Sequence, residues 1–353
     1  MKRSFRTVGV LGAAAALALT AAGCSSSSTS SESTAAASAP ASAAASSTCA
    51  AVAPADTTIA FVMGAEADPF FQAMKVGAEA EAAAKGVQLI WQGDPSNYSP
   101  ETQIPIVDNV LAQNPTALVL IPTDPKALQA SADKAVAAGV VVANVDTHVD
   151  NLDNTLTFIT GDNTDGGAKA ADAIAQAIGY QDGKEYKVVI GLTSKTATTN
   201  VARQEGFTKA VESKYPGIKI VDVAYSESNP EKAATNVNNW LTKYPDLAGI
   251  FAIDGTNASG AAAAIEAKGL KGKVALVGYD AYPDNVAKIK SGIFTALIAQ
   301  DPAAEAKQAI DTITDYLANC TTPAQRDVVI PNVTLDANTS EADLAKYTYV
   351  ATK

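Results

Sequence analysis

The feature of the sequence that most constrains the fold is a repeated alternation of short apolar stretches with longer alanine-rich stretches. Apolar stretches as long as a buried strand occur at residues 59–63, 87–91, 118–121, 140–145 and 156–159. Helical patterns lie between them near 69–85, 101–113 and 125–138, where Pro69 and Pro125 suit the first helical turn. Repeated units of this kind predict a parallel sheet with helices on both faces.

The same alternation begins again after residue 160. Strand patterns occur at 187–192, 218–223, 249–253, 274–279 and 294–298, with helical patterns near 202–214, 230–244, 258–268 and 283–291. Two halves of equal style predict an α/β chain with two similar lobes rather than one large sheet.

The end of the chain determines how the two lobes are joined. A helical pattern at 302–319 follows the tenth strand, and an apolar run follows at 327–330. If this helix packs on the first lobe, the chain crosses between lobes near Ile159, Ala299 and Asp327, which predicts a three-connection hinge. We therefore assign residues 56–160 and 301–327 to the N-terminal lobe, and 161–300 and 328–348 to the C-terminal lobe.

The N-terminus indicates export. Lys2, Arg3 and Arg6 precede an apolar run at 8–22, which predicts a signal peptide at 1–23. The small residues before Cys24 resemble a bacterial lipobox, which implies a lipid on Cys24 and a location at the outer face of the cytoplasmic membrane. The alternative is ordinary cleavage nearby, with Cys24 lost or free. Residues 24–55, nearly all Ser, Ala and Thr up to 48, predict a disordered linker.

Two cysteines remain once Cys24 is assigned to lipidation. An even number in an oxidising compartment predicts a disulfide between Cys49 and Cys320, and the alternative is two free thiols.

Charge and composition narrow the classes of function. The chain has 26 Lys and Arg against 37 Asp and Glu, a net charge of −11, which argues against nucleic acid as a partner. His148 is the only histidine, so no Cys/His or Ser/His catalytic pair can form elsewhere in the chain. No nucleotide-binding, zinc or EF-hand motif is present. We expect a monomeric binding protein without cofactor or metal; paired carboxylates keep a carboxylate-dependent hydrolase open.

Several short stretches resemble those of the ribose-type sugar-binding proteins of bacterial ABC importers, the type I periplasmic binding fold. In chain order they are ADPFF at 67–71, LIPTD at 120–124, VD at 145–146, GDN at 161–163 with GG at 166–167, RQEGF at 203–207, YPD at 244–246, GYD at 278–280 and IAQ at 298–300. The resemblance spans residues 57–326. It implies two Rossmann-like lobes that close on a ligand by hinge motion.

The resemblance also implies a set of ligand contacts. They are Asp68, Phe70, Phe71, Asp146, Arg203, Asp254, Asp280 and Gln300, with Thr147, His148, Trp91 and Asn257 as weaker candidates. The two phenylalanines would stack on a sugar ring, Arg203 would donate, and the carboxylates would accept hydrogen bonds. Each has a structural alternative: the phenylalanines suit a core, and Asp68 suits a helix cap. Aromatic residues assigned to packing are Trp91, Tyr98, Tyr279 and Tyr282.

The chain departs from the family pattern at the predicted site. Asp68 and Asp254 stand where the family usually has asparagine, Gly255 stands where an aspartate usually follows, and Thr147 stands where arginine is common. Carboxylates only accept hydrogen bonds when ionised, so the ligand should be rich in donors: a sugar, a polyol or an amine-bearing compound. An anionic ligand is disfavoured because it would meet buried charge of its own sign.

The sequence thus predicts an extracytoplasmic solute-binding protein that delivers a sugar or polyol to an ABC permease. A second hypothesis on the same fold is a signalling receptor for an autoinducer-like or amine-bearing molecule, and a third, of another class, is the hydrolase.

Overall fold

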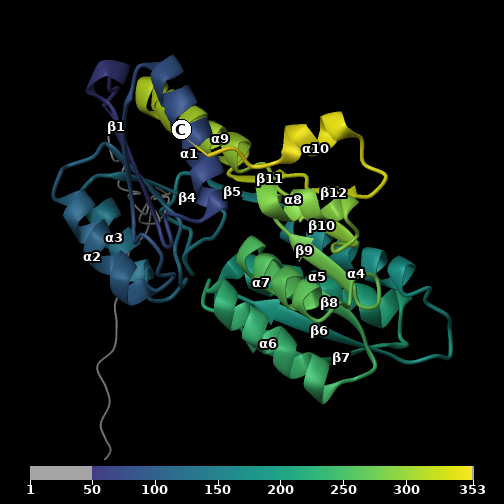
Figure 1. Cartoon of the computed structure of the whole chain (residues 1–353). Helices are drawn as coiled ribbons and strands as arrows, with labels where there is room; N and C mark the ends of the chain where they lie inside the picture. The colour runs from purple at the N-terminus through teal and green to yellow at the C-terminus, as the bar shows by residue number, and fades with distance from the viewer. Residues whose placement is uncertain (1–49, 352–353) are drawn as a thin grey trace, which may run out of the picture. The chain divides into compact units, whose positions relative to one another are not determined.

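The computed structural model of the chain describes residues 50–351 (Figure 1). The predicted signal peptide at 1–23, the lipidation site Cys24, nearly all of the linker and Cys49 lie outside the described residues. Across residues 50–351, no helix is both long enough and apolar enough to cross a membrane.

The first sheet contains six parallel strands in the order β11-β5-β4-β3-β1-β2. The strands are β1 (Thr58–Met63), β2 (Gln88–Gly93), β3 (Ala117–Leu120), β4 (Val141–Val145), β5 (Phe158–Gly161) and β11 (Asp327–Ile330). Helices α1 (Pro69–Lys85) and α9 (Pro302–Asn319) lie side by side on one face, and α2 (Pro100–Leu111) and α3 (Gln129–Ala137) cover the other (Figure 1).

Strand β1 shows why this sheet is buried on both faces. Ile59, Phe61 and Met63 pack with α1 and α9, whereas Ala60 and Val62 pack with α2 and α3. All five side chains are fully buried, as expected for a central strand of a parallel sheet covered on both sides.

The second sheet has the order β12-β10-β9-β8-β6-β7. Its strands are β6 (Tyr186–Leu192), β7 (Ile218–Tyr225), β8 (Leu247–Ala252), β9 (Ala275–Tyr279), β10 (Ala296–Ala299) and β12 (Val333–Asp336). Helices α4 (Asn163–Ala177) and α5 (Thr198–Lys214) cover one face, and α6 (Pro230–Lys243), α7 (Gly255–Ala267) and α8 (Pro283–Lys290) cover the other. Strand β12 pairs antiparallel with β10, so this sheet is mixed.

The chain passes between the lobes three times, as predicted, but one crossing is displaced. The crossings run from β5 to α4, from β10 to α9, and from β11 to β12. Because β11 pairs in parallel with β5 in the first sheet, residues 328–330 belong to the N-terminal lobe, and their assignment to the C-terminal lobe is wrong. At this edge of the first sheet Val328 and Ile330 are half-buried, whereas Val329 is exposed.

Three further differences concern local structure. Pro125 does not begin a helix: the Asp124 side chain accepts hydrogen bonds from the N–H groups of Lys126 and Ala127, which forms a turn, and α3 begins only at Gln129. Helix α5 begins at Thr198 rather than near residue 202. The polar tail contains β12 and α10 (Glu341–Tyr347), which the sequence pattern did not predict.

The start of the described chain lies against the end of α9. The N–H of Val52 donates to the carbonyl of Leu317 at 2.9 Å, and Cys320, which ends α9 with a left-handed φ of 55°, is disulfide-bonded. Its pairing with Cys49 remains a prediction, because Cys49 lies outside the described residues.

Candidate functional site

A cavity between the lobes, here called the inner cavity, brings the predicted ligand contacts together. All eight residues of the main predicted set line it, from Asp68 in the first lobe to Gln300 after β10. The remaining lining residues are Tyr98, Thr193, Thr199, Asn200, Ser228 and Tyr282. The inner cavity has a volume of about 50 Å³. Several side chains of its lining bond with one another, as Tyr282 does with Asp68 and Thr193 with Asp254.

Asp146 follows strand β4 and contributes a carboxylate from the first lobe. Its φ of 59° is left-handed, a conformation that aspartate tolerates better than most residues. Thr160 Oγ1 donates to its backbone carbonyl at 2.8 Å. The carboxylate itself accepts no hydrogen bond from any group within the described part of the chain, although the side chain is buried. An acceptor held in this way is ready for a donor from a ligand.

Asp280 follows strand β9 and is the matching carboxylate of the second lobe. Its φ of 66° is also left-handed. Unlike Asp146, it accepts three hydrogen bonds: from the N–H of Gly255 at 2.9 Å, from Gln300 Nε2 at 2.8 Å and from the Tyr349 hydroxyl at 3.1 Å. These donors fix its orientation at the cavity wall.

Asp68 and Asp254 are both helix caps and cavity residues. Asp254 precedes α7, accepts from the N–H of Asn257 at 2.8 Å, and also accepts from Thr193 Oγ1 at 2.8 Å and Asn257 Nδ2 at 2.7 Å. Asp68 precedes α1 and accepts from the N–H of Phe70 at 2.9 Å. Capping and a position on the cavity are therefore combined at the same two residues.

Asp68 also joins the two lobes directly. Its Oδ1 accepts from the hydroxyl of Tyr282, and its Oδ2 accepts from Thr256 Oγ1 at 3.3 Å. Both donors belong to the second lobe, so the capping residue of α1 bonds across the cleft.

Arg203 supplies the positive charge of the cavity. Its Nε donates to Asn163 Oδ1 at 2.7 Å and its Nη1 to the carbonyl of Ile253 at 3.0 Å. The guanidinium lies 3.8 Å from the ring centre of Tyr279, a cation–π contact. A Cβ on Gly167 would lie 2.0 Å from the Arg203 carbonyl, so glycine in α4 lets α5 approach closely enough to bring Arg203 to this place.

The apolar wall consists of Phe70 and Phe71 at the start of α1. Their ring centres are 5.3 Å apart and nearly perpendicular, and both side chains are only 5% exposed. They line the inner cavity and also belong to the hydrophobic core, so their structural role is clear and their contact with a ligand stays a prediction.

The electrostatics of the cavity reflect its burial. Burial raises the pKa of Asp68 to about 7 against the lowering effect of the Tyr282 hydrogen bond. Burial likewise raises the pKa of Asp146 to about 7, which the charge of Arg203 opposes. Burial also raises the pKa values of Tyr98 and Tyr282, so their hydroxyls stay neutral donors.

The four weaker candidates do not line the inner cavity. Trp91 stacks on Phe61 with ring centres 5.2 Å apart, Thr147 donates to the carbonyl of Pro122 at 2.8 Å, and Asn257 orients Asp254. His148 faces a separate cavity beside the hinge and packs edge-on against Phe158. No group of histidine, cysteine and acidic side chains suitable for a metal occurs in residues 50–351.

Three tyrosines at the site were missed by sequence reasoning. Tyr98 and Tyr282, assigned there to packing, line the inner cavity. The position of Tyr282 two residues after Asp280 was an available signal. Tyr349 gave no signal, because its segment returns to the site only through the tertiary fold, where its N–H donates to the carbonyl of Ala281 at 2.9 Å.

The known proteins named here as similar to this chain are all binding proteins of one kind. A profile of the periplasmic binding protein domain matches residues 59–320. The chain is 30% identical over 287 residues to the D-ribose/D-allose-binding protein of Pseudomonas aeruginosa, covering 79% of this chain and 88% of that protein. It is also 30% identical to the D-allose-binding periplasmic protein of Escherichia coli, over 69% of this chain and 79% of that one.

Solved structures agree with these relatives. An ABC transporter solute-binding protein from Agrobacterium vitis, bound with alpha-D-tagatopyranose, superposes with a TM-score of 0.78 at 30% identity and covers 83% of this chain and 99% of its own. A carbohydrate transporter solute-binding protein from Agrobacterium radiobacter, in complex with D-arabinose, superposes with a TM-score of 0.77 at 28% identity. The match covers 82% of this chain and 98% of that protein's chain. The two-lobed fold and the matched profile together place this chain in the periplasmic binding protein family.

Proposed function

We propose that this protein captures a sugar or polyol between its two lobes outside the cytoplasm and delivers it unchanged to an ABC permease. The observation that carries the proposal is the composition of the inner cavity. Two phenylalanine rings, one guanidinium and four carboxylates from both lobes converge there, and one carboxylate, Asp146, has no protein donor within the described residues. All relatives named above are binding proteins.

The chemistry of this cavity favours a ligand with many donors. Phe70 and Phe71 offer apolar faces to the C–H surface of a sugar ring, and Asp146 offers free acceptor oxygens to its hydroxyls. Arg203 offers the only guanidinium of the lining. Four carboxylates against one arginine disfavour an anion, which supports a neutral or amine-bearing ligand.

Binding would work as a shift between conformations. Asp68 of the first lobe bonds to Tyr282 and Thr256 of the second, so contact between the lobes and contact with the ligand involve the same residues. A ligand that bonds to both lobes stabilises the form in which they touch.

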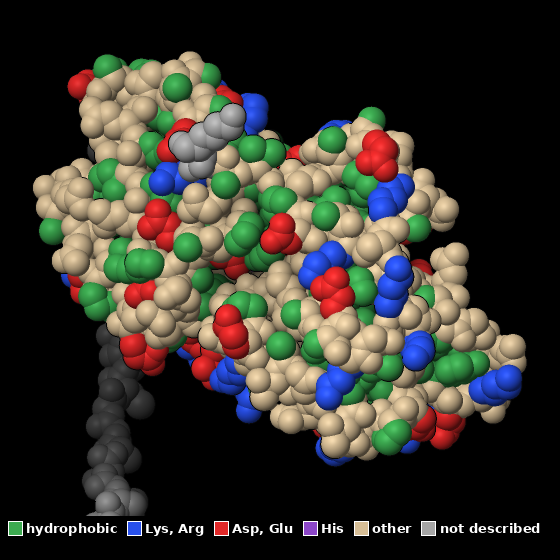
Figure 2. All heavy atoms as spheres, in the orientation of Figure 1, with side chains coloured by type: hydrophobic (Ala, Val, Ile, Leu, Met, Phe, Trp, Pro, Cys, Tyr) green, Lys and Arg blue, Asp and Glu red, His purple; other side chains and the backbone are tan. Residues whose placement is uncertain are grey.

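On the face shown in Figure 2, Lys and Arg side chains are scattered among Asp and Glu over both lobes.

The export features belong to the same proposal. A lipid on Cys24 would anchor the protein at the outer face of the cytoplasmic membrane, and residues 25–48, rich in serine and alanine, would link the anchor to the folded lobes. The hydrogen bond from Val52 to Leu317 supports the Cys49–Cys320 disulfide, since it brings the start of the described chain beside α9.

A thermal-shift screen tests the proposal. The purified protein is melted with D-ribose, D-allose, D-arabinose, D-tagatose, D-fucose, simple polyols and amino sugars. At least one should raise the melting temperature, by an amount that grows with the logarithm of its concentration over Kd. The variant Asp146→Asn should lose most of this shift, whereas Asp150→Asn, at an exposed position in the same loop, should keep it.

Two outcomes would contradict the proposal. If no sugar, polyol or amine changes the melting temperature, ligand capture is refuted. If a stabilising compound is recovered from the incubation with an altered mass, the hydrolase hypothesis replaces it. Loss of uptake of that compound in cells without the protein would favour transport over signalling.

A further inference from the structure

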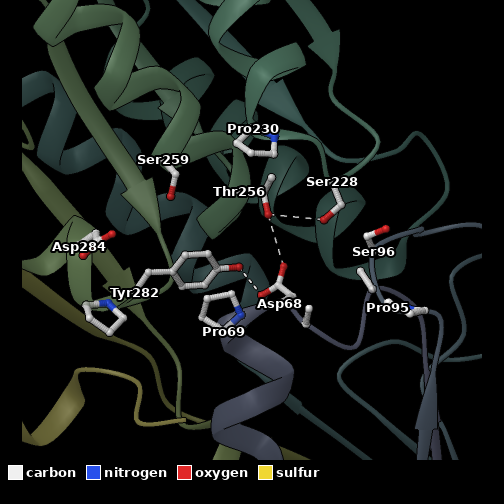
Figure 3. A pocket seen from close by; sticks show the side chains of 13 residues that line it. Asp68, Pro69, Pro95, Ser96, Ser228, Pro230, Thr256, Ser259, Tyr282 and Asp284 are labelled. Carbon is white, nitrogen blue, oxygen red and sulfur yellow. Dashed lines mark hydrogen bonds between the residues drawn. The ribbon is translucent and has the colours of Figure 1, made fainter.

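A second cavity, here called the outer cavity, lies between the lobes (Figure 3). Its volume is about 430 Å³. The first lobe contributes the start of α1 and the loop at Pro95 and Ser96, and the second contributes Ser228 and the residues around Thr256 and Tyr282. The outer cavity shares Asp68, Ser228 and Tyr282 with the inner cavity, so the two adjoin at these residues.

The partition between the two cavities is a small set of hydrogen bonds. The Tyr282 hydroxyl donates to Asp68 Oδ1, and Thr256 Oγ1 lies 3.3 Å from Asp68 Oδ2 and 3.5 Å from Ser228 Oγ (Figure 3). The Tyr282 ring packs so closely on Gly255 that a Cβ there would lie 2.1 Å from it. The absence of a side chain at residue 255 therefore allows Tyr282 to reach Asp68.

Size distinguishes the two cavities. Ligand pockets of proteins commonly measure about 300–1,000 Å³. The outer cavity, at about 430 Å³, falls within this range, and the inner cavity, at about 50 Å³, falls below it. A ligand that occupied the inner cavity alone would use the smaller part of the space available between the lobes.

The lining of the outer cavity defines what it can hold. Pro69, Pro95, Pro230 and Pro283, together with the Tyr282 ring, provide rigid apolar surfaces of the kind that pack against a flat ring. The polar groups are serine and threonine hydroxyls and the carboxylates of Asp68 and Asp284. The lining contains no lysine, arginine or histidine, so a negatively charged group would find no cation there.

We infer that the outer cavity is a second ligand subsite, which holds a neutral or cationic ring joined to the sugar in the inner cavity. The ligand class is then a glycoside or a disaccharide rather than a single monosaccharide, and the inference rests on the proposed sugar-binding function. The link between the two rings passes where the Tyr282 hydroxyl meets Asp68, so Tyr282 turns aside when such a ligand binds. Asp68 then faces both rings.

The test compares one-ring and two-ring ligands by isothermal titration calorimetry. The probes are the monosaccharide that gives the largest thermal shift, its methyl glycosides and its 4-nitrophenyl glycosides, each as both anomers. In the unmodified protein, one nitrophenyl anomer should bind at least as tightly as the parent sugar. Ser96→Trp, at an exposed outer-cavity position that does not line the inner cavity, should weaken that glycoside about tenfold or more and change the parent sugar by less than about twofold.

A matched control keeps the test interpretable. Ser213→Trp introduces the same side chain at an exposed position on α5 that lines neither cavity and should leave all affinities unchanged. Failure of every nitrophenyl glycoside to bind the unmodified protein, while the parent sugar binds, overturns the second subsite. Equal weakening of glycoside and parent sugar by Ser96→Trp also overturns it. If neither sugars nor glycosides bind, the proposed function fails as well, which is a distinguishable result.

Discussion

Asp146 and Asp280 occupy equivalent places in the two lobes, yet their surroundings differ. Each follows a central strand of its sheet, each has a left-handed φ, and each lines the inner cavity. Asp280 accepts hydrogen bonds from Gly255, Gln300 and Tyr349, whereas the Asp146 carboxylate accepts none from the described residues. The same strand-end geometry thus carries a satisfied carboxylate in one lobe and an unsatisfied one in the other.

The difference in hydrogen bonding indicates that the two carboxylates have different parts in the site. Asp280 is held by its three hydrogen bonds before any ligand arrives, so the free energy of these bonds already contributes to the stability of the ligand-free protein. Asp146 is buried with no hydrogen bond to its carboxylate from the described residues, and the charge of Arg203 offsets only part of the cost of burying its ionised form. In the proposed function, a ligand would therefore gain more from the first lobe's carboxylate, while the second lobe's carboxylate would offer it an acceptor of fixed orientation.

The largest effect is expected from Asp280→Ala. It leaves three donors without their acceptor and places alanine at a φ of 66°, so the free energy of unfolding should fall by about 3–5 kcal/mol in urea denaturation without ligand. Asp280→Asn keeps one acceptor oxygen and tolerates the left-handed backbone, and should lose only about 1–2 kcal/mol. If Asp280→Ala matched Asp146→Ala in stability, the two carboxylates would not differ as described.

The next effect concerns pH and distinguishes Asp146 by its charge. Because its pKa is raised to about 7 in the folded protein, above about 3.9 in an unfolded chain, ionised Asp146 destabilises the fold. Stability from this group is fully present below pH 3.9 and is lost as pH rises toward 7. Asp146→Asn removes the titration, so its stability relative to the unmodified protein should rise by about 4 kcal/mol between pH 4 and pH 8.

The measurement is a series of ligand-free urea titrations at pH 4, 5, 6, 7 and 8. Asp150→Asn is the matched control, since it removes an exposed carboxylate from the same loop. A difference between Asp146→Asn and the unmodified protein that did not grow with pH would mean that burial does not disfavour this charge.

A smaller effect should come from the hydroxyl that supports Asp280 from the end of the chain. Tyr349→Phe removes a donor to Asp280 and an acceptor for the N–H of Gln300, at 3.3 Å, and keeps the ring against Phe70. The free energy of unfolding should fall by about 1–1.5 kcal/mol. Tyr347→Phe, at a partly exposed position in the same segment, should change little, and an equal loss in both variants would show that Tyr349 has no special relation to Asp280.

Sequence reasoning predicted most of the fold because the fold depends on local patterns. The ten strands expected up to Ile298 all exist within a few residues of their predicted positions, since buried parallel strands leave short apolar runs. It misplaced residues 328–330 and missed β12 because short edge strands are chosen by their neighbours. It misread Pro125 because a proline suits a turn as well as a helix start.

The site was predictable only where its residues lie in recognisable strings. The eight main candidates line one cavity because the carboxyl ends of parallel strands meet at one edge. What the sequence could not give is how these residues bond with one another. It treated Asp146 and Asp280 as equivalent and gave no sign of Tyr349, since a partner that comes from the far end of the chain has no local pattern.

The smallest expected effect tests the backbone that the two carboxylates share. At Asp146 the φ of 59° costs alanine about 1 kcal/mol or more and costs glycine nothing, although glycine loses more entropy on folding. Asp146→Gly should therefore be more stable than Asp146→Ala by about 0.5–1 kcal/mol. At Thr147, whose φ is not left-handed, the glycine variant should be less stable than the alanine variant.

Because neither variant at Asp146 leaves a protein donor unpaired, the pair isolates backbone strain from hydrogen bonding, which the same pair of variants at Asp280 would not. If the order at Asp146 were the same as at Thr147, the strain would lie elsewhere, and the unsatisfied carboxylate would be the only distinguishing feature of the first lobe's half of the site.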